Sequence, residues 1–100
     1  MSSKVIYTEK HLQISKFAKA MSHPARVFIL EKLSKMDSCC YSGDIADELK
    51  IGRSSLSQHL KELKFAGLIQ GETEPPYIKY CINRENWQLA KLMCQEMFKE

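Results

Sequence analysis

The sequence lacks long apolar runs and segments of biased composition. No apolar stretch approaches the ~20 residues that a helix needs to cross a bilayer. The opening letters MSSKVIYTEKHLQ lack the apolar core of a secretion signal. The 100 residues contain no internal repeat, low-complexity tract or linker. We therefore expect one domain with a single modest core, located in the cytoplasm.

Acidic residues are scarce in the first third of the chain. Residues 1–35 carry seven Lys or Arg against two Glu, although the net charge of the whole chain is only +3. Such a local excess suits a polyanionic partner, but it does not establish one alone.

Cysteine occurs at four positions, two of them adjacent in the stretch DSCCYSG. Most thiols of a cytoplasmic protein are reduced. Adjacent cysteines are also poor disulfide partners, because a bridge between neighbours strains the backbone. We expect no structural disulfide.

Apolar residues recur with helical spacing in the first third of the chain. The spacing of Ile14, Phe17, Ala18 and Met21 predicts a helix over about 9–22. Pro24 suits the first turn of a second helix. The apolar face of that second helix is expected to consist of Ala25, Phe28, Ile29, Leu33 and Met36.

Two shorter helices joined by the tight turn KIG are predicted next. Ser42 is expected to cap the third helix, with Asp44 in its favourable first turn. The fourth helix is expected to begin near Arg53 and to end at Gly67, in the position of a left-handed C-terminal residue.

After Gly67 the apolar period changes from 3.6 to 2. The letters LIQGETEPPYIKYCI predict a strand, a turn with prolines near its tip, and a second strand. In the second strand one face is expected to hold Ile78, Tyr80 and Ile82, and the other Tyr77, Lys79 and Cys81.

Asn83 is expected to cap a last helix over about 84–98. Its apolar residues cover more than one stripe, which is more than one core contact needs and indicates a dimer interface. The expected interface residues, from the first and last helices, are Phe17, Met21, Trp87, Leu89, Ala90, Leu92, Met93 and Met97.

The predicted order is helix, helix, helix, helix, β-hairpin, helix. Two short helices with a tight turn, followed by a hairpin, make a winged helix-turn-helix, mainly α with a β-hairpin wing (α+β). We expect residues 1–100 to form one DNA-binding domain with dimerisation helices at about 9–22 and 84–98.

The predicted fourth helix carries its leucines on one face and polar residues on the other. Small hydroxyls allow close approach to a major groove, glutamine can contact an adenine edge, and arginine can contact a guanine or a phosphate. The expected DNA-binding residues are Arg53, Ser54, Ser55, Ser57, Gln58 and Lys61, with His59 and Lys64 nearer the backbone phosphates. The alternative is an ordinary solvated face, but the preceding helix, the turn and the hairpin favour contact with DNA.

Three segments together resemble the ArsR/SmtB family of bacterial winged-helix repressors. They are AMSHPARVFILEKLSK, GDIADELKIGRSSLSQHLKELKFAGLI and the hairpin end IKYCI, and the resemblance covers roughly residues 12–98. It implies a homodimer built from the first and last helices, bound to double-stranded DNA at an imperfect palindrome. It also implies an inducer that lowers the affinity for DNA.

The predicted wing departs from this family, whose wings often carry basic residues. Here the tip contains Glu72 and Glu74, which repel phosphate, so any wing contact is expected to fall to Lys79 or Tyr77.

The family's two well-known metal sites are not matched either. Its Cys-x-Cys positions would fall on Tyr41 and Gly43, and its site on the last helix would need a histidine, where this chain has Arg84 and Asn86 nearby. We expect no zinc site on the last helix.

The cysteines are the remaining candidates for sensing an inducer. Thiolates suit soft ions such as As(III), Sb(III) or Cu(I). Cys39 and Cys40 are the expected pair, with Cys81 or Cys94 as a third thiol. The alternatives are reversible oxidation by oxidants or reactive sulfur, and cysteines that act only as small apolar residues.

Two other function classes remain. An enzyme is not expected, because the chain has no phosphate-binding glycine loop, no HExxH and no supported Ser/His/Asp set. A Cys40–His59 pair would need a pocket for which this fold has little room. A winged helix that contacts protein or RNA would tend to expose apolar residues on its fourth helix, and this one exposes Ser, Gln and Lys.

Overall fold

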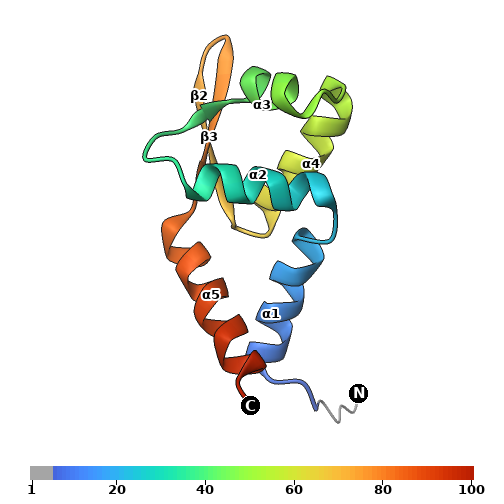
Figure 1. The fold of residues 1–100 in the computed structure, drawn as a ribbon, viewed down its shortest axis with the longest axis vertical. Coiled ribbons are helices and arrows are strands. Elements are labelled where there is room, and N and C mark those ends of the chain that lie inside the picture. Colours follow the sequence, from blue (N-terminus) through green and yellow to red (C-terminus); the bar gives the residue numbers. More distant parts are fainter. Residues whose placement is uncertain (1–5) are drawn as a thin grey trace.

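The computed structural model describes residues 6–100, apart from the side chain of Glu74. Lys4 of the basic first segment and the Glu74 carboxylate therefore lie outside the described part. The elements follow the predicted order with one addition (Figure 1). They are α1 (Glu9–Ala20), α2 (Pro24–Ser34), β1 (Cys40–Tyr41), α3 (Ser42–Leu49), α4 (Arg53–Phe65), β2 (Ile69–Glu74), β3 (Tyr77–Ile82) and α5 (Arg84–Phe98).

The strands form an antiparallel sheet in the order β1-β3-β2, with the β2–β3 hairpin as the wing. Because register partners in an antiparallel sheet share a face, the pairs Tyr41–Lys79, Glu72–Lys79 and Gln70–Cys81 define one face. We call this the outer face; it also carries Tyr77. The inner face carries Cys40, Ile78, Tyr80 and Ile82 and lies against the helices. The predicted alternation in the second strand is confirmed.

Strand β1 is absent from the sequence prediction, which has a loop there. It contains two residues, Cys40 and Tyr41, paired with Tyr80 and Lys79. Two residues are too few to show an apolar period, so no sequence pattern marks this strand. It forms by pairing with β3.

Local signals set most of the helix ends. His23 caps α2, its Nδ1 accepting from the Ala25 N–H at 3.0 Å, and Asn83 caps α5, its Oδ1 accepting from the Asn86 N–H at 3.1 Å. Gly67 has φ +83°, as expected for a left-handed residue after α4. The prediction that Ser42 caps α3 is wrong: Tyr41 is the capping residue, without a side-chain bond, and Ser42 is the first helical residue because β1 extends directly into the helix.

The core lies where α2, α3 and α4 cover the inner face of the sheet. Its fully buried large side chains are Ile29, Leu30, Leu33, Ile45, Leu63, Leu68 and Ile69. Two expectations fail here. Leu30 is 1% exposed although it was not placed on the apolar face, and Ala18 is exposed because α1 turns that side to solvent.

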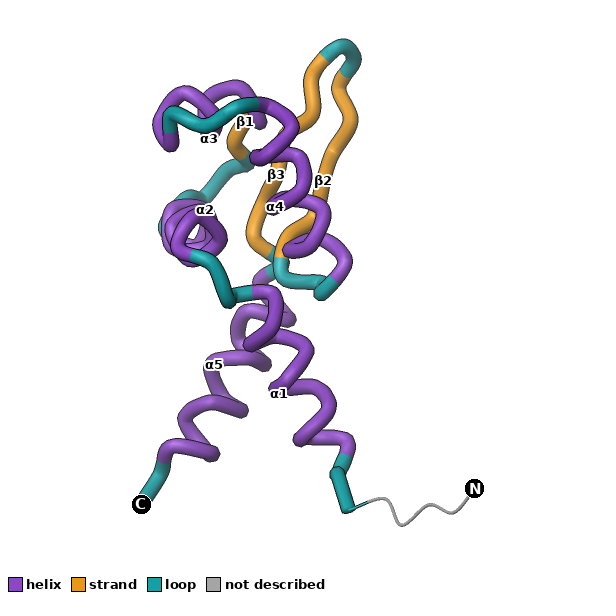
Figure 2. Tube along the Cα trace, turned by 90° about the vertical axis from the view of Figure 1, so that its right-hand side faces the viewer, coloured by secondary structure: helices purple, strands orange, loops and turns teal. Residues whose placement is uncertain are grey.

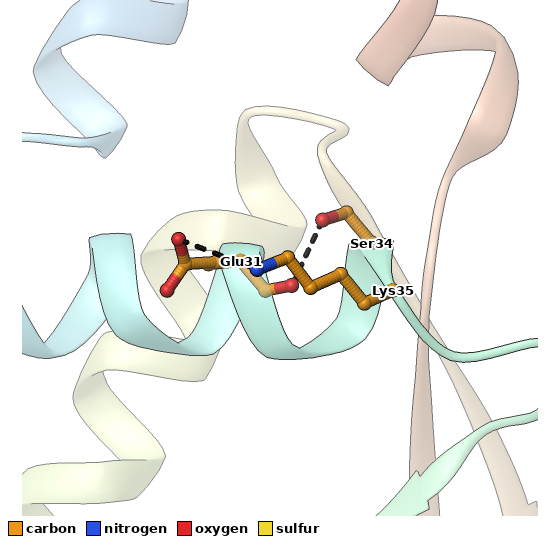
Figure 3. A network of polar contacts seen from close by, with 3 residues as sticks. All are labelled: Glu31, Ser34 and Lys35. Atoms are coloured by element: carbon orange, nitrogen blue, oxygen red, sulfur yellow. Dashed lines mark hydrogen bonds and ion pairs between the residues drawn. The ribbon is translucent and has the colours of Figure 1, made fainter.

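The carboxyl end of α2 is held from both sides. Within the helix, the Ser34 hydroxyl donates to the Glu31 carbonyl at 2.9 Å, and Lys35 pairs with the Glu31 carboxylate at 3.7 Å (Figure 3). From α5, Arg84 donates to the carbonyls of Ser34 at 2.9 Å and Met36 at 2.8 Å. These bonds satisfy carbonyls that have no partner inside a helix.

Helices α1 and α5 contact each other and extend away from the body formed by α2, α3, α4 and the sheet (Figure 2). Their bounds agree with the predicted dimerisation helices within two residues. Several apolar side chains on α5 remain exposed in the single chain: Leu89, Leu92, Met97 and Phe98.

Over residues 6–100, no helix is both long enough and apolar enough to cross a membrane.

Candidate nucleic-acid interface

Helix α4 separates its leucines cleanly from its polar residues. Leu56, Leu60 and Leu63 are at most 3% exposed and fix the helix on the core. The opposite face is open to solvent and holds Arg53, Ser54, Ser55, Ser57, Gln58, Lys61 and Lys64. All seven were predicted as DNA-contacting residues. Their exposure leaves this face available to a groove, and their individual contacts stay predictions.

One of these residues is already held in place. The Gln58 amide donates to the Glu62 carboxylate at 3.1 Å, one helical turn further on. A bidentate contact of Gln58 with an adenine edge needs that amide, so the bond to Glu62 must be given up or shared when α4 enters a groove.

His59 lies in a different environment from its neighbours. It is half-buried between α4 and α2, where its Nδ1 accepts from Arg26 Nε at 3.0 Å and its ring lies 4.4 Å from that of His23. Burial, followed by the charges of His23 and Arg26, lowers the pKa of His59. Its hydrogen bond with Arg26 joins α4 to α2. The predicted phosphate contact of His59 stays a prediction.

A cleft of about 580 Å³ separates the start of α4 from the wing. It is lined by Ser42 and Asp44 of α3, by Arg53, and by Pro76, Tyr77 and Ile78 of the wing. Arg53 and the wing therefore line the same opening. A stretch of sugar-phosphate backbone in this opening would contact both α4 and the wing.

On the wing, Lys79 and Tyr77 occupy the outer face of the sheet. Lys79 Nζ lies 5.5 Å from the centre of the Tyr41 ring, and the Tyr41 and Tyr77 rings meet edge to face at 5.6 Å. Lys79 thus points away from the inner face that packs on α3 and α4. Its predicted DNA contact stays a prediction.

The structure pairs the thiols differently from the sequence expectation. Cys39, the residue before β1, is bonded in a disulfide to Cys81 of β3, with their Cα atoms 4.4 Å apart. The expectation of no disulfide is therefore wrong. It rested on reduced thiols in the cytoplasm and on the strain of bridging neighbours, whereas the antiparallel register of Cys40 with Tyr80 places Cys39 directly opposite Cys81.

Cys39 and Cys40 are not brought together, because successive residues of a strand point to opposite faces. Cys40 is 6% exposed in the core, and burial, assisted by Asp44 and Glu48, raises the pKa of its thiol. Lys32 lies close to this cluster and pairs with Glu48 at 2.7 Å.

A carboxylate adjoins the disulfide. Glu72 places an oxygen so that it and the sulfur atoms of Cys39 and Cys81 all lie within 4.8 Å of one another. The fold therefore separates the two predicted third thiols. Cys81 is bonded to Cys39, whereas Cys94 lies apart, beside Met21 and Trp87.

The predicted dimer residues also divide into two groups. Phe17 and Ala90 are 2% and 4% exposed, so they belong to the core of the single chain. Leu89, Leu92 and Met97 are exposed. Met21, Trp87 and Met93 are partly buried against the core.

Comparison with known proteins shows to which family this chain belongs. The family model described as "Bacterial regulatory protein, arsR family" matches residues 23–70, from the cap of α2 to the start of β2. The chain is also 35% identical over 74 residues to the uncharacterized HTH-type transcriptional regulator MJ1325 of Methanocaldococcus jannaschii, covering 74% of this chain and 82% of that protein. The chain belongs to the ArsR family.

Further relatives cover most of the chain. The transcriptional repressor SdpR of Bacillus subtilis is 36% identical over an alignment of 77 residues that covers 71% of this chain and 83% of SdpR. The structure of HlyU from Vibrio cholerae N16961 superposes with a TM-score of 0.70 at 26% identity, covering 89% of this chain and all of that one. This ArsR-family protein is a transcriptional regulator with a winged-helix DNA-binding fold, and not an enzyme.

Proposed function

We propose that the protein is a homodimeric repressor that reads an imperfect palindrome with α4 and leaves it when an inducer reacts with its thiols. The observation that carries the proposal is the exposed polar face of α4, held rigidly by three buried leucines beside the wing cleft. A rigid helix with small hydroxyls, an amide and a guanidinium at its amino end is suited to a major groove. In addition, SdpR is named as a repressor.

A homodimer is supported by the apolar surface of α5. Leu89, Leu92, Met97 and Phe98 are between 41% and 72% exposed in the single chain. Large apolar side chains grouped on one helix are typical of an interface. Two-fold symmetry then presents two α4 helices to DNA, and this is why we propose a palindromic site.

For the inducer we propose a trivalent metalloid, As(III) or Sb(III), bound by reduced Cys39 and Cys81. Soft ions prefer thiolate donors, and these two sulfurs are the ones that the fold brings together, with Glu72 as an adjacent oxygen. A metalloid between two sulfurs separates them more than a direct bond does. Binding therefore fixes β1 and β3 at a spacing different from that of the disulfide, and α3, which follows β1 without a linker, takes a different position accordingly.

DNA reading is tested by selecting duplexes from a random pool and titrating the enriched sequence at several salt concentrations. A palindromic sequence should be enriched, and its affinity should fall steeply as salt rises because bound counterions are released. Equal binding to random duplex, or preference for RNA, would contradict the proposal.

The inducer is tested on the reduced protein bound to the selected duplex. Arsenite should release wild type and a Cys94→Ser control, but not Cys81→Ser. Release of the Cys81→Ser variant would place the inducer elsewhere while leaving the DNA-binding proposal intact.

A further inference from the structure

The disulfide between Cys39 and Cys81 lies near the surface, and exposed disulfides are the labile or regulatory ones. Both residues are only partly buried, on the outer face of the sheet rather than in the core. A DNA-binding regulator acts in the compartment that holds the DNA, and this compartment is normally reducing. Disulfides in reducing compartments are mostly transient, either catalytic or redox-sensing. The location therefore indicates a bond that opens and closes rather than a permanent staple.

Strand β1 depends on this bond more than an ordinary strand would. Its two residues make only two register pairs with β3, Cys40–Tyr80 and Tyr41–Lys79. The Cys39–Cys81 bond adds a covalent link at the next position along the ladder. Among the described elements β1 has β3 as its only strand neighbour, because it lies at the edge of the sheet.

A movement of β1 is passed to α4, the helix proposed to read DNA, through α3 and two short connections. Tyr41 is both the last residue of β1 and the capping residue of α3, so no loop absorbs a movement of the strand. At its other end α3 is joined to α4 through Lys50, Ile51 and Gly52, with Lys50 in the left-handed conformation. A shift of β1 therefore moves α3 and the amino end of α4, where Arg53 and the wing line the same cleft.

We propose that Cys39 and Cys81 form a reversible redox switch, the cross-strand thiol pair, whose closed state fixes β1 on β3 and holds α3 and α4 in the DNA-reading arrangement. The inference rests on the proposed DNA-binding function and adds a second input to it. Closure removes conformational freedom before DNA arrives, so less ordering is required on binding and the closed protein binds more tightly.

The chemistry balances with a hydroperoxide as oxidant. One thiolate attacks the peroxide oxygen and becomes a sulfenic acid, releasing an alcohol or water after protonation. The second thiolate then attacks that sulfur, forms the S–S bond and expels hydroxide, which is protonated to water. Two thiols and one hydroperoxide thus give one disulfide, one water and one alcohol (a second water for hydrogen peroxide). Two equivalents of a small thiol reverse the step and leave as their own disulfide.

Closure also changes the response to the proposed inducer. A metalloid needs both sulfurs as thiolates, and the closed pair offers neither. The oxidised repressor therefore stays on its operator when arsenite is added, whereas the reduced repressor is released.

The experiment compares purified full-length protein oxidised with hydrogen peroxide and reduced with a phosphine, on the duplex selected from the random pool. The mass of the trypsin-cut peptides reports the state of the pair. We expect the oxidised wild type to bind about 10-fold more tightly than the reduced form, within the range usual for coupled sites. The Cys94→Ser control should keep that ratio, and Cys39→Ser and Cys81→Ser should bind equally after either treatment.

A second readout does not depend on DNA. Amide hydrogen exchange over residues 42–49 should be about 10-fold slower in the oxidised wild type, because α3 opens less often when β1 is fixed. The two thiol variants should exchange at the reduced rate under both conditions.

The outcomes separate the two proposals. Equal DNA affinity in the two redox states, tighter binding by the reduced form, or a ratio that persists in Cys39→Ser would each overturn the switch. If neither state prefers any duplex, the proposed function fails, and the exchange of α3 alone then decides whether the pair controls this helix.

Discussion

Opening the Cys39–Cys81 bond should cost a large part of the stability of this domain. The bond joins residues 42 positions apart, so it restricts the unfolded chain far more than a short bridge would. The loop-closure relation gives about 4 kcal/mol for a loop of this length. A single domain has only about 5–15 kcal/mol of unfolding free energy in total, so the reduced protein should be markedly easier to unfold.

The measurement is urea unfolding of oxidised and reduced protein, followed by the fluorescence of Trp87. With an m value of about 2 kcal/mol per M, a loss of 4 kcal/mol lowers the midpoint by about 2 M. Protein concentration must be equal in both samples, since a dimer gains stability with concentration. Cys94→Ser is the matched control, because its thiol is free in the described structure and its replacement leaves the bond intact.

Two results would refute the reasoning. Midpoints that agree within about 0.3 M would mean that the bond does not restrict the unfolded chain. An equal effect of phosphine on Cys81→Ser would show that the reagent acts elsewhere.

Four other outcomes are expected. Gln58→Ala should weaken binding to the selected duplex by about 1–3 kcal/mol in anisotropy titrations, and an equal loss on every sequence would demote this residue to a backbone contact. Leu63→Ala should lower the unfolding free energy by about 2–5 kcal/mol, since the side chain is fully buried, and a loss below about 1 kcal/mol would contradict that burial. The lowered pKa of His59 means that the folded state favours the neutral ring, so its contribution is present above the ordinary value of 6.5 and is lost as pH falls below it. Denaturation at pH 7.5 and 5.5 should show this loss in wild type and less of it in His59→Gln, and parallel losses would exclude His59 as the cause. Finally, iodoacetamide should modify Cys94 of the reduced protein faster than Cys40, whose burial raises its pKa, whereas equal rates, read by mass spectrometry, would show that the core opens readily.

Local signals in the sequence were sufficient for most of the fold. Pro24 and Asn83 mark helix starts through their own backbone and side-chain chemistry. Gly67 marks a helix end because only a residue tolerant of positive φ suits that position. Each signal acts within one helical turn, so a single sequence is enough to read it.

The thiol arrangement could not be predicted in the same way. Cys39 meets Cys81 only because β1 pairs with β3, and two residues of strand give no periodic pattern to detect. His59 presents a similar difficulty: helical spacing placed it beside the polar face, but its contacts with Arg26 and His23 belong to a helix crossing. Both features depend on segments that are distant in sequence.

The two hydrogen bonds from Arg84 to the end of α2 would couple the arrangement of two subunits to the position of the DNA-binding helices. They fasten the first turn of α5 to the segment that leads into Cys39. In a dimer joined through α5, a change in the angle between the subunits would therefore also move the DNA-binding body of each subunit, formed by α2, α3, α4 and the sheet. In such a dimer the same movement would change the span between the two α4 helices, which must match half-sites about 34 Å apart.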